Sequence, residues 1–311
     1  MAYPLVFRSD ARPFHGSLGG LNYGIGSRSS DPNFDGSPPS RITGLRGDIP
    51  LFKNGELGLT FLDFSSAASG NGLVSGSVGS GSLYGARLRL NPAGRFAFSG
   101  EASRSVASRA LSKADDDGDE SSAFTLNLNY NGGAVTGAAG YRYYDPSFTR
   151  PGDWDKLGSW YNPTNVQGPY ARVGGRFENL HADLGVDYLT GARNRPGYGG
   201  FTQGSSVFRG QAGLGYHFSK QFEITANYEG VLYDMSGAIS ATGLRAKPVE
   251  QYLTLGAGLN VSGSTVLRLA YQVINVQDAG NGFGLAPAYG GSYPGGASTS
   301  TVFSTQLAIH F

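Results

Sequence analysis

Apolar and polar residues alternate one by one along most of this chain. In the last segment, Phe303, Leu307, Ile309 and Phe311 share one set of alternate positions, and the residues between them are mostly small or polar. A period of two over about ten residues predicts a β-strand with one apolar face. Helical periodicity does not compete over a comparable length, so the pattern predicts an all-β chain. Further alternating segments lie at 16–26, 56–64, 123–130, 135–144, 180–188, 208–218, 222–232 and 252–261.

The connections between these segments alternate between short and long. The long ones are rich in Gly, Ser, Asn, Asp and Pro, the usual residues of surface loops. This alternation is typical of an up-and-down barrel in the outer membrane, with short periplasmic turns and long external loops. A Greek-key sandwich has no reason to show it. Short connections lie near 53–55, 91–94, 131–133, 178–179, 219–220 and 262–264, and long ones near 66–81, 107–121, 145–167, 191–205, 234–248 and 277–299.

Counting the strands gives thirteen from Ser40 onward and one more at 16–26, which makes fourteen. An even number places both chain ends on the periplasmic side. The segment 56–64 has two nearly equal faces, so twelve or sixteen strands are the alternatives. We therefore expect an all-β fold, a transmembrane up-and-down antiparallel β-barrel of about 14 strands over residues 15–311. Residues 1–14 would form a periplasmic segment, a plug or a linker.

A soluble β-sandwich with amphipathic strands is the competing interpretation, because alternation alone does not say which face is buried. Aromatic residues at both ends of the predicted strands favour the membrane, where they gather at the two interfaces. Tyr143 and Tyr188 lie at predicted external ends. The predicted periplasmic ends carry Phe96, Tyr130, Phe177, Phe218, Phe222 and Phe311.

Composition narrows the functional classes. The chain has 311 residues with 50 Gly, 18 Tyr, 18 Phe, no Cys, 15% charged residues and a formal net charge of +1. The lack of cysteine excludes a disulfide scaffold, a thiolate metal site and a cysteine nucleophile. A net charge near zero argues against a general nucleic-acid binder. No stretch approaches the roughly 18 consecutive apolar residues that predict a transmembrane helix.

If the apolar faces point to lipid, the charged residues between them line the lumen. In the first half of the circumference they are six basic and two acidic, and in the second half two basic and five acidic. This imbalance predicts a field across the pore, and the alternative is that the charges pair across strands. The predicted lining residues are Arg46, Asp48, Arg87, Arg89, Glu101, Arg142, Arg172 and Arg176 in the first half, and Asp183, Asp187, Arg209, Glu223, Glu229, Glu250 and Arg268 in the second.

The long connection 145–167 is the predicted constriction of the pore. It is braced by prolines and holds two tryptophans, whose large surfaces favour burial. We expect it to fold into the lumen or over its mouth, and packing on neighbouring loops or on a partner subunit is the equal alternative. The constriction candidates are Asp153, Trp154, Asp155 and Trp160. Inward glycines leave either free volume or room for such a loop, and they include Gly213, Gly215, Gly256 and Gly258.

The C-terminal strand, with Phe303, Leu307, Ile309 and Phe311, resembles the signal through which the barrel-assembly machinery inserts outer-membrane proteins. The resemblance implies that this machinery is a partner of the chain.

The stretch 143–168 is similar to the barrel domain of outer-membrane porins that carry an N-terminal S-layer-homology domain. In that family a strand ends in a Tyr/Asp-Pro element and leads into a P-G-x-W loop and an N-P-T-N element. The matching positions are Asp145-Pro146, Pro151-Gly152-Asp153-Trp154 and Asn162-Pro163-Thr164-Asn165. The resemblance implies a porin barrel. The S-layer-homology domain itself is absent from these 311 residues, so the resemblance does not extend to the family's cell-wall tethering.

The acidic run at 115–120 has the alternating spacing of a calcium loop at Asp115, Asp117 and Asp119. Its glycine comes too early, and no bidentate Glu follows at the required distance. We expect a solvated loop there, and neither a metal nor a cofactor in the chain.

A hydrolase could be built around His181, Asp183 and His217, which share the polar face of neighbouring strands. A serine placed by a nucleophile motif is missing, so we expect no catalytic residue and no enzyme.

The sequence therefore predicts an outer-membrane porin of a Gram-negative bacterium, a passive diffusion channel for small hydrophilic solutes and ions. A structural or anchoring barrel with a plugged lumen is the alternative, and an outer-membrane hydrolase ranks third. The expected partners are outer-membrane lipid and small hydrophilic solutes. The sequence is compatible with a monomer and with a trimer, and in a trimer further copies of the chain are also partners. Residues 1–7 lack the basic and apolar regions of a signal peptide, so we expect a mature or truncated form.

Overall fold

The computed structural model describes residues 14–18, 21–29, 40–66, 80–107, 121–148, 156–158, 160–161, 163–194, 201–239, 245–262, 265–277 and 297–309. The regular elements in these ranges are β-strands. No helix in them is long and apolar enough to cross a membrane.

The strands are β1 Phe14–Leu18, β2 Leu21–Ser29, β3 Ser40–Phe52, β4 Gly55–Ser66, β5 Ser80–Ala93, β6 Phe96–Ala107, β7 Ser122–Asn131, β8 Val135–Tyr144, β9 Lys156–Leu157, β10 Trp160–Tyr161, β11 Val166–Phe177, β12 Leu180–Gly191, β13 Ser206–His217, β14 Phe222–Ile239, β15 Arg245–Ala246, β16 Val249–Ser262, β17 Thr265–Gln277 and β18 Ala297–Ile309.

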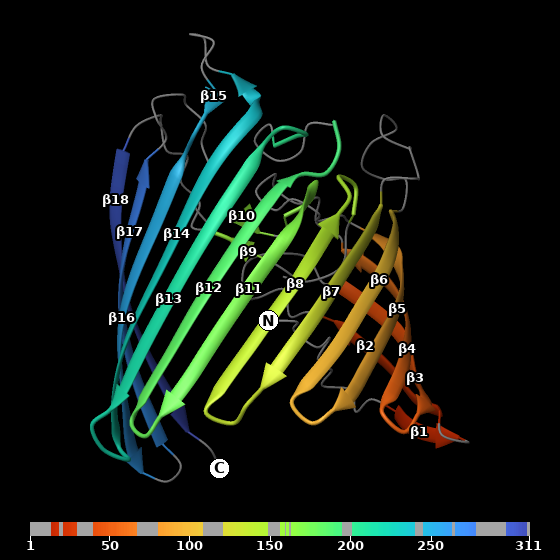
Figure 1. The fold of residues 1–311 in the computed structure, drawn as a ribbon, viewed down its shortest axis with the longest axis horizontal. Helices are drawn as coiled ribbons and strands as arrows, with labels where there is room; N and C mark the ends of the chain where they lie inside the picture. The colour runs from red at the N-terminus through yellow and green to blue at the C-terminus, as the bar shows by residue number, and fades with distance from the viewer. Residues whose placement is uncertain are drawn as a thin grey trace.

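The long strands form one up-and-down sheet, in which each pairs antiparallel with the next long strand along the chain. The path runs from β1 through β8, β11 to β14 and β16 to β18, while β15 pairs with β14, and β9 and β10 form a separate hairpin. Without the short β1 and β15, this 16-stranded sheet has fourteen strands of 9 to 18 residues. The predicted fold class and strand number are confirmed. The strands are tilted, and the sheet curves round on itself as a barrel wall (Figure 1).

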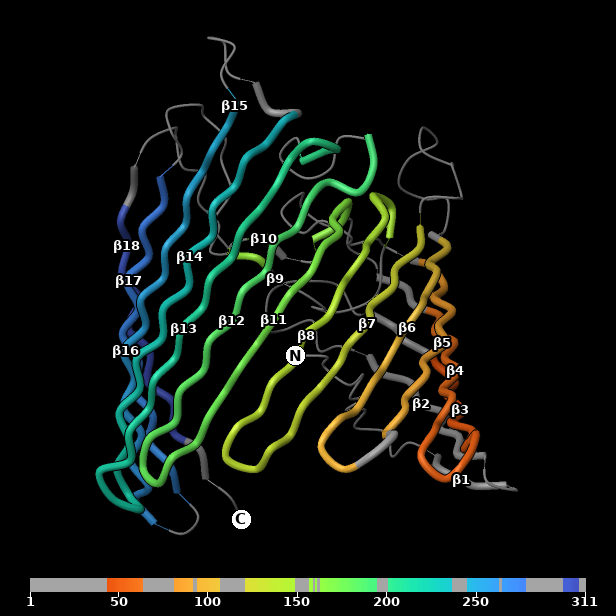
Figure 2. The backbone as a smooth tube through the Cα atoms, viewed as in Figure 1, coloured from red at the N-terminus to blue at the C-terminus, as the bar shows by residue number. Residues whose placement is uncertain are grey.

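The connections differ between the two ends of the wall (Figure 2). One end has tight turns, such as the two residues 53–54 between β3 and β4, and the other has long connections, such as 145–165 between β8 and β11. The predicted alternation of connection lengths is therefore present. β18 ends beside the start of β17, where Ile309 lies opposite Thr265, so the C-terminal strand finishes at the short-turn end.

The segment predicted as one strand at 16–26 is divided into two. β1 and β2 form an antiparallel hairpin in which Leu18 lies opposite Leu21. The sequence between them is Gly19-Gly20, and two glycines are a favoured sequence for a two-residue hairpin turn. The alternation of Leu21, Tyr23 and Ile25 belongs to β2 alone.

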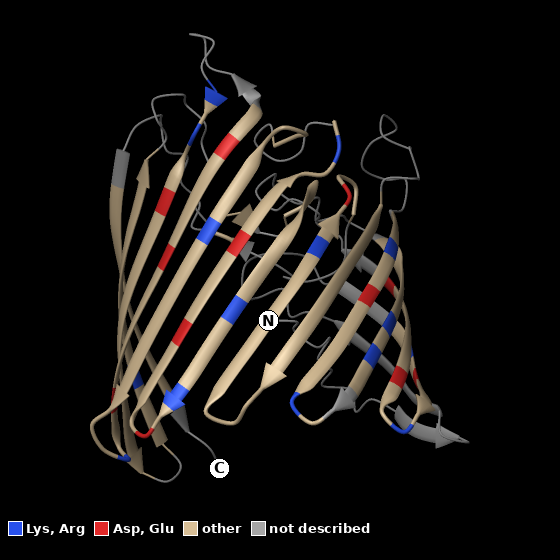
Figure 3. Ribbon diagram, viewed as in Figure 1, with Lys and Arg blue, Asp and Glu red and all other residues tan. Residues whose placement is uncertain are grey.

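The two faces of the sheet differ in chemistry. On β12, Leu184 is 58% exposed and Val186 is 47% exposed. Asp187, the residue directly after Val186, points to the other face and is 1% exposed. We call the face with Asp187 the inner face and the face with Leu184 the outer face. The same alternation continues on β13, where Phe208 is exposed and Arg209 is buried. Charged positions recur along the strands of the wall (Figure 3).

At the long-loop end the inner face becomes apolar. Strand residues such as Val207 and Val231 join Trp160 and Phe201 of the long connections in one buried cluster. Trp160 and Phe201 contact each other with ring centroids 5.2 Å apart. The rest of this cluster is Leu62, Leu83, Ala123, Tyr144, Phe148, Leu157, Val166, Leu189, Tyr233, Met235 and Ala246. Side chains of two long loops therefore pack inside the wall at this end.

Candidate functional site

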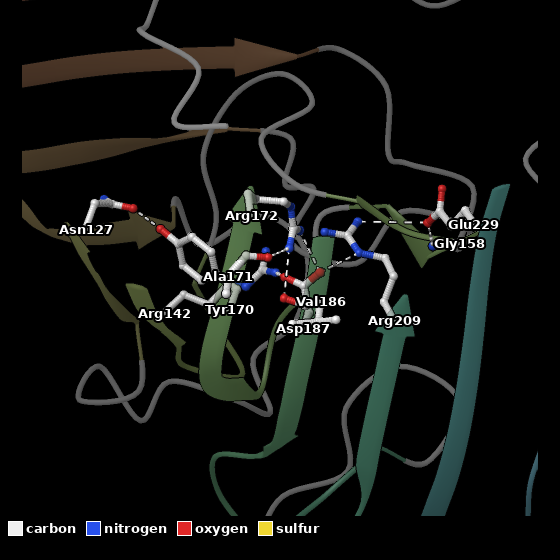
Figure 4. Close-up of polar contacts among 10 residues, drawn as sticks. All are labelled: Asn127, Arg142, Gly158, Tyr170, Ala171, Arg172, Val186, Asp187, Arg209 and Glu229. Atoms are coloured by element: carbon white, nitrogen blue, oxygen red, sulfur yellow. Dashed lines mark hydrogen bonds and ion pairs between the residues drawn. The ribbon is translucent and has the colours of Figure 1, made fainter. Parts of the chain in front are cut away.

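Three arginines from three strands converge on one buried carboxylate. Asp187 of β12 has a fully buried side chain and binds Arg142 of β8, Arg172 of β11 and Arg209 of β13. Arg172 Nη2 lies 2.6 Å from Asp187 Oδ2, and Arg209 Nε lies 2.8 Å from the same oxygen. Arg142 Nη2 donates to Oδ1. Figure 4 shows the three guanidinium groups pointing to this carboxylate.

The strand register explains why these residues meet. Asp187 lies directly opposite Arg209 on β13 and opposite Tyr170 on β11. Arg142 and Arg172 lie on either side of Tyr170 on the same face. Arg172 is two positions after Tyr170 on β11, and Arg142 of β8 lies opposite Gly168, which is two positions before Tyr170. Cross-strand neighbours lie about 5 Å apart, within reach of long side chains.

Two further side chains extend this network along the wall. The Tyr170 hydroxyl donates to Asn127 Oδ1 on β7, and the Arg142 guanidinium lies 5.2 Å from the centre of the Tyr170 ring. On the other side, Arg209 Nη1 lies 3.9 Å from Glu229 Oε1 on β14. The chain of polar contacts thus crosses the inner face from β7 to β14 (Figure 4).

The connection between β8 and β11, which we call the β8–β11 loop, touches the end of this network. Its hairpin β9–β10 packs on the inner face of β14 and β16. The Tyr233 hydroxyl donates to the Leu157 carbonyl at 2.9 Å, and the Gly158 N–H donates to Glu229 Oε1 at 3.2 Å. Leu157 is fully buried.

Gly158 is required at the tip of that hairpin. Its φ is +57°, in the left-handed region that side chains disfavour. A Cβ at this position would also collide with the carboxylate of Glu250, which is fully buried. The described residues of this loop lie against the inner face of the wall, and its role as a constriction stays a prediction. Asp153, Trp154 and Asp155 lie outside the described residues, so of the four constriction candidates only Trp160 is placed.

The loop is anchored at its two ends by residues of the sequence motif. Asp145 is 1% exposed, accepts from the Ser122 N–H at 3.1 Å and binds Arg193 Nε at 3.2 Å. The hydrogen bond from Arg193 to the Asp145 side chain raises the pKa of Arg193 above its ordinary value, so this cation stays charged.

Asn165 closes the other end of the loop and is fully buried. Its Nδ2 donates to the carbonyls of Arg193 and Phe201 at 3.3 and 3.2 Å, and its Oδ1 accepts from the Arg193 N–H at 2.8 Å. Both motif residues therefore tie the β8–β11 loop to the connection between β12 and β13.

A second ionic cluster lies near the short-turn end of β3 to β5. Arg46 binds Asp48 at 3.1 Å, and Arg87 reaches Asp48 at 3.3 Å and Glu56 at 2.9 Å. Glu56 was missed in the sequence because the two faces of its segment are nearly equally apolar. Tyr170 and Asn127 were missed because they carry no charge, although alternation places both on the inner face.

The remaining predicted lining residues take inner-face positions without forming one site. Glu223 lies near His181 and His217, Glu250 accepts from the Tyr252 hydroxyl at 2.9 Å, and Arg268 lies near Gln306. By strand alternation, Arg89, Glu101, Arg176 and Asp183 also belong to the inner face. The residues proposed as the insertion signal lie on the outer face where described, with Phe303 67% and Leu307 60% exposed. Phe311 and the acidic run at 115–120 lie outside the described residues.

The inward glycines are covered by side chains of neighbouring strands. A Cβ at Gly213 would meet Asp183, one at Gly215 would meet the His181 ring, and one at Gly256 would meet Thr225. Within the Asp187 network, Arg172 lies across Gly185 and Tyr170 across Gly140. At these glycines the structure therefore shows neither free volume nor a docked loop, because each glycine lets a side chain of a neighbouring strand lie along the wall.

Comparison with protein-family models and with curated protein sequences found no match. Solved structures resemble the fold. OccK7 (OpdD) of Pseudomonas aeruginosa matches over 96% of this chain and 78% of its own, with 9% identity and a TM-score of 0.54. OccAB4 of Acinetobacter baumannii matches over 95% and 74%, with 11% identity and a TM-score of 0.52. A BenF-like porin from Pseudomonas fluorescens Pf-5 matches over 96% and 77%, with 12% identity and a TM-score of 0.51. The fold of this chain is that of porin barrels.

Proposed function

We propose that this protein is a bacterial outer-membrane channel through which small hydrophilic solutes and ions diffuse passively. The observation that carries the proposal is the β8–β11 loop, whose hairpin packs on the inner face beside the arginines around Asp187. A loop held inside a barrel narrows its lumen, and charged side chains at the narrow part interact with each passing solute.

The outer face supports a position in lipid. Large apolar side chains are exposed along the strands, among them Leu184, Leu214 and Leu255 at 58, 55 and 48%. In water, such a continuous apolar surface would be an aggregation or docking site. Aromatic contacts near the short turns, such as Phe96 with Tyr130 and Phe218 with Phe222, suit an interfacial girdle. The proposed relationship to porins that carry an S-layer-homology domain rests only on the sequence motif at 143–168.

A plugged barrel is the second candidate, and the buried apolar cluster at the long-loop end favours it. Phe148, Leu157, Trp160 and Phe201 are each no more than 1% exposed, although all four belong to connections rather than to the wall. If this packing closes the cross-section, the barrel serves as an anchor or scaffold. An enzyme is not proposed, since no nucleophile motif accompanies the inner-face histidines.

Single-channel conductance in planar bilayers tests the proposal. We expect open channels from the wild type and a larger conductance after deletion of residues 152–162, because the deletion removes the inner hairpin. Gly158→Ala should raise conductance in part, since its Cβ displaces the tip from Glu250. Gly94→Ala is the matched control: its φ is +54°, but a Cβ there meets no atom within 4 Å.

The outcomes separate the candidates. A conducting wild type whose conductance rises on deletion supports a channel with a constriction loop. A wild type that does not conduct, and a deletion variant that does, supports the plugged barrel. Unchanged conductance after deletion contradicts a constriction by this loop.

A further inference from the structure

Two histidines and a glutamate meet on the inner face near the short-turn end, away from the Asp187 network. They are His181 of β12, His217 of β13 and Glu223 of β14, and their ligand atoms all lie within 4.8 Å of one another. The Nε2 atoms of His181 and His217 lie 3.5 and 3.7 Å from Glu223 Oε1. The two rings are 5.8 Å apart between centroids.

The strand register builds this group from three adjacent strands. His217 lies directly opposite Glu223, and His181 lies opposite Gly215. Gly215 is two positions before His217 on β13 and belongs to the same face. Gly215 has no side chain, so the His181 ring extends over it toward His217. Because the ligands sit on paired strands, side-chain rotation alone can bring them together.

We propose that His181, His217 and Glu223 form a binding site for a divalent transition-metal ion such as Zn²⁺. Neutral imidazole nitrogens and a carboxylate are a ligand set that zinc, copper and nickel bind well. Around a tetrahedral zinc, ligand atoms lie about 3.4 Å apart, as follows from bonds of about 2.0–2.2 Å. The two histidine–glutamate distances already approach that spacing.

The surroundings leave the site able to take an ion. The side chains of His181 and Glu223 are 32 and 29% exposed, so water can complete the coordination. Among the described residues, His181 Nδ1 is buried without a hydrogen-bond partner, so no such bond fixes the ring against turning toward an ion. Arg176, opposite His181 on β11, is the cation nearest in register, and Asp183 follows two positions along β12. On the other side of the site, Arg268 of β17 lies opposite Gly258, which is itself opposite Glu223.

Metal binding by the purified chain, carrying no polyhistidine tag, tests the site without reference to conductance. Titration of ZnCl₂ into folded protein in detergent should give one ion per chain, removable by EDTA, with no comparable binding of Ca²⁺. His181→Gln and His217→Gln should each weaken binding at least ~10-fold, since even supporting residues around a metal cost 10–100-fold when lost. Gln211→Ala, on the same strand and face as His217, is the matched control and should bind as the wild type does.

A measurement on the unaltered chain guards against variants that fail to fold. Electron paramagnetic resonance of bound Cu²⁺ should show coupling to two imidazole nitrogens. Absence of binding by the wild type, equal affinity in the histidine variants, or a copper spectrum without two-nitrogen coupling would each overturn the site.

Discussion

Asp187 is the residue on which the inner face depends most. One carboxylate, fully removed from water, holds three guanidinium groups from three strands. Such a buried ionic group is stable only while its charges are matched and its hydrogen bonds are made. Glu229 supplies a second negative charge through Arg209, which limits the positive excess of the network.

Asp187→Asn should destabilise the wall strongly. It removes the negative charge and leaves Arg142, Arg172 and Arg209 beside one another in a poorly solvated place. Removal of one partner of a buried ion pair costs about 3–5 kcal/mol. We expect a loss of that order in the free energy of unfolding in urea, measured in lipid vesicles.

Asp183→Asn is the control for that experiment. Asp183 lies on the same strand and the same face, four positions away, but is exposed. Its substitution should change stability by less than about 0.5 kcal/mol. Equal losses in the two variants would mean that the network contributes nothing particular to the wall.

The sequence predicts which residues share the inner face, but not which of them touch. Alternation groups Arg142, Asp187 and Arg209 on one face of the sheet, and the three side chains are in contact. It does not show that Asp187 takes all three arginines, because that depends on register and on glycines such as Gly185 that admit a side chain across them. The same limit hid the meeting of His217 with Glu223, which requires the β13–β14 register.

Among the elements, the β8–β11 loop has the most specific attachments. Asn165 and Asp145 fix its two ends to the connection after β12, and Tyr233 fixes its tip to β14. The motif that suggested a relationship from the sequence therefore has a structural role at Asp145 and Asn165. Strands and turns were predictable because period-two alternation and turn residues are local, whereas the docking position of a loop depends on distant strands.

Asn165→Ala should release the connection after β12. It removes three hydrogen bonds of a buried amide. It also places an alanine at a φ of +59°, in the left-handed region that Asn adopts more readily than Ala. Such losses cost about 1–3 kcal/mol, enough to raise the open population roughly tenfold. We expect trypsin to cut after Arg193 correspondingly faster, as followed by mass spectrometry of the fragments.

Asn179→Ala supplies the comparison, because Asn179 is exposed in a short turn at the other end. It should leave cleavage after Arg193 unchanged. A cleavage rate in Asn165→Ala equal to that of the wild type would show that the backbone contacts of the loop suffice without this amide.

At the scale of the whole molecule, the inner face is balanced in charge. Between residues 44 and 277, strand alternation and contacts assign eight basic and eight acidic side chains to it among the described residues. Asp187, an acidic residue of the second half of the chain, pairs with Arg142 and Arg172 of the first half and with Arg209 of the second. This pairing reduces the separation predicted between a basic first half and an acidic second half of the lumen. The basic residues are Arg46, Arg87, Arg89, Arg142, Arg172, Arg176, Arg209 and Arg268, and the acidic ones are Asp48, Glu56, Glu101, Asp183, Asp187, Glu223, Glu229 and Glu250.

This balance predicts weak ion selectivity. Across a gradient of KCl, the reversal potential of the open channel should lie near zero, because neither sign of ion meets a dominant opposite charge. Asp187→Asn should move it toward the value for anions, provided that the variant folds. A wild-type reversal potential close to the limit for either ion would contradict a balanced lumen.

The docking of Leu157 on Tyr233 also bears on the order in which the chain folds. The hairpin of the β8–β11 loop precedes β14 by more than sixty residues, yet its hydrogen-bond partners are on β14 and its neighbour is on β16. It has nothing to dock on until β11 to β16 have paired. Burial of Trp160 should therefore be among the last events of assembly, and its fluorescence in a Trp154→Phe variant would report when the wall is complete.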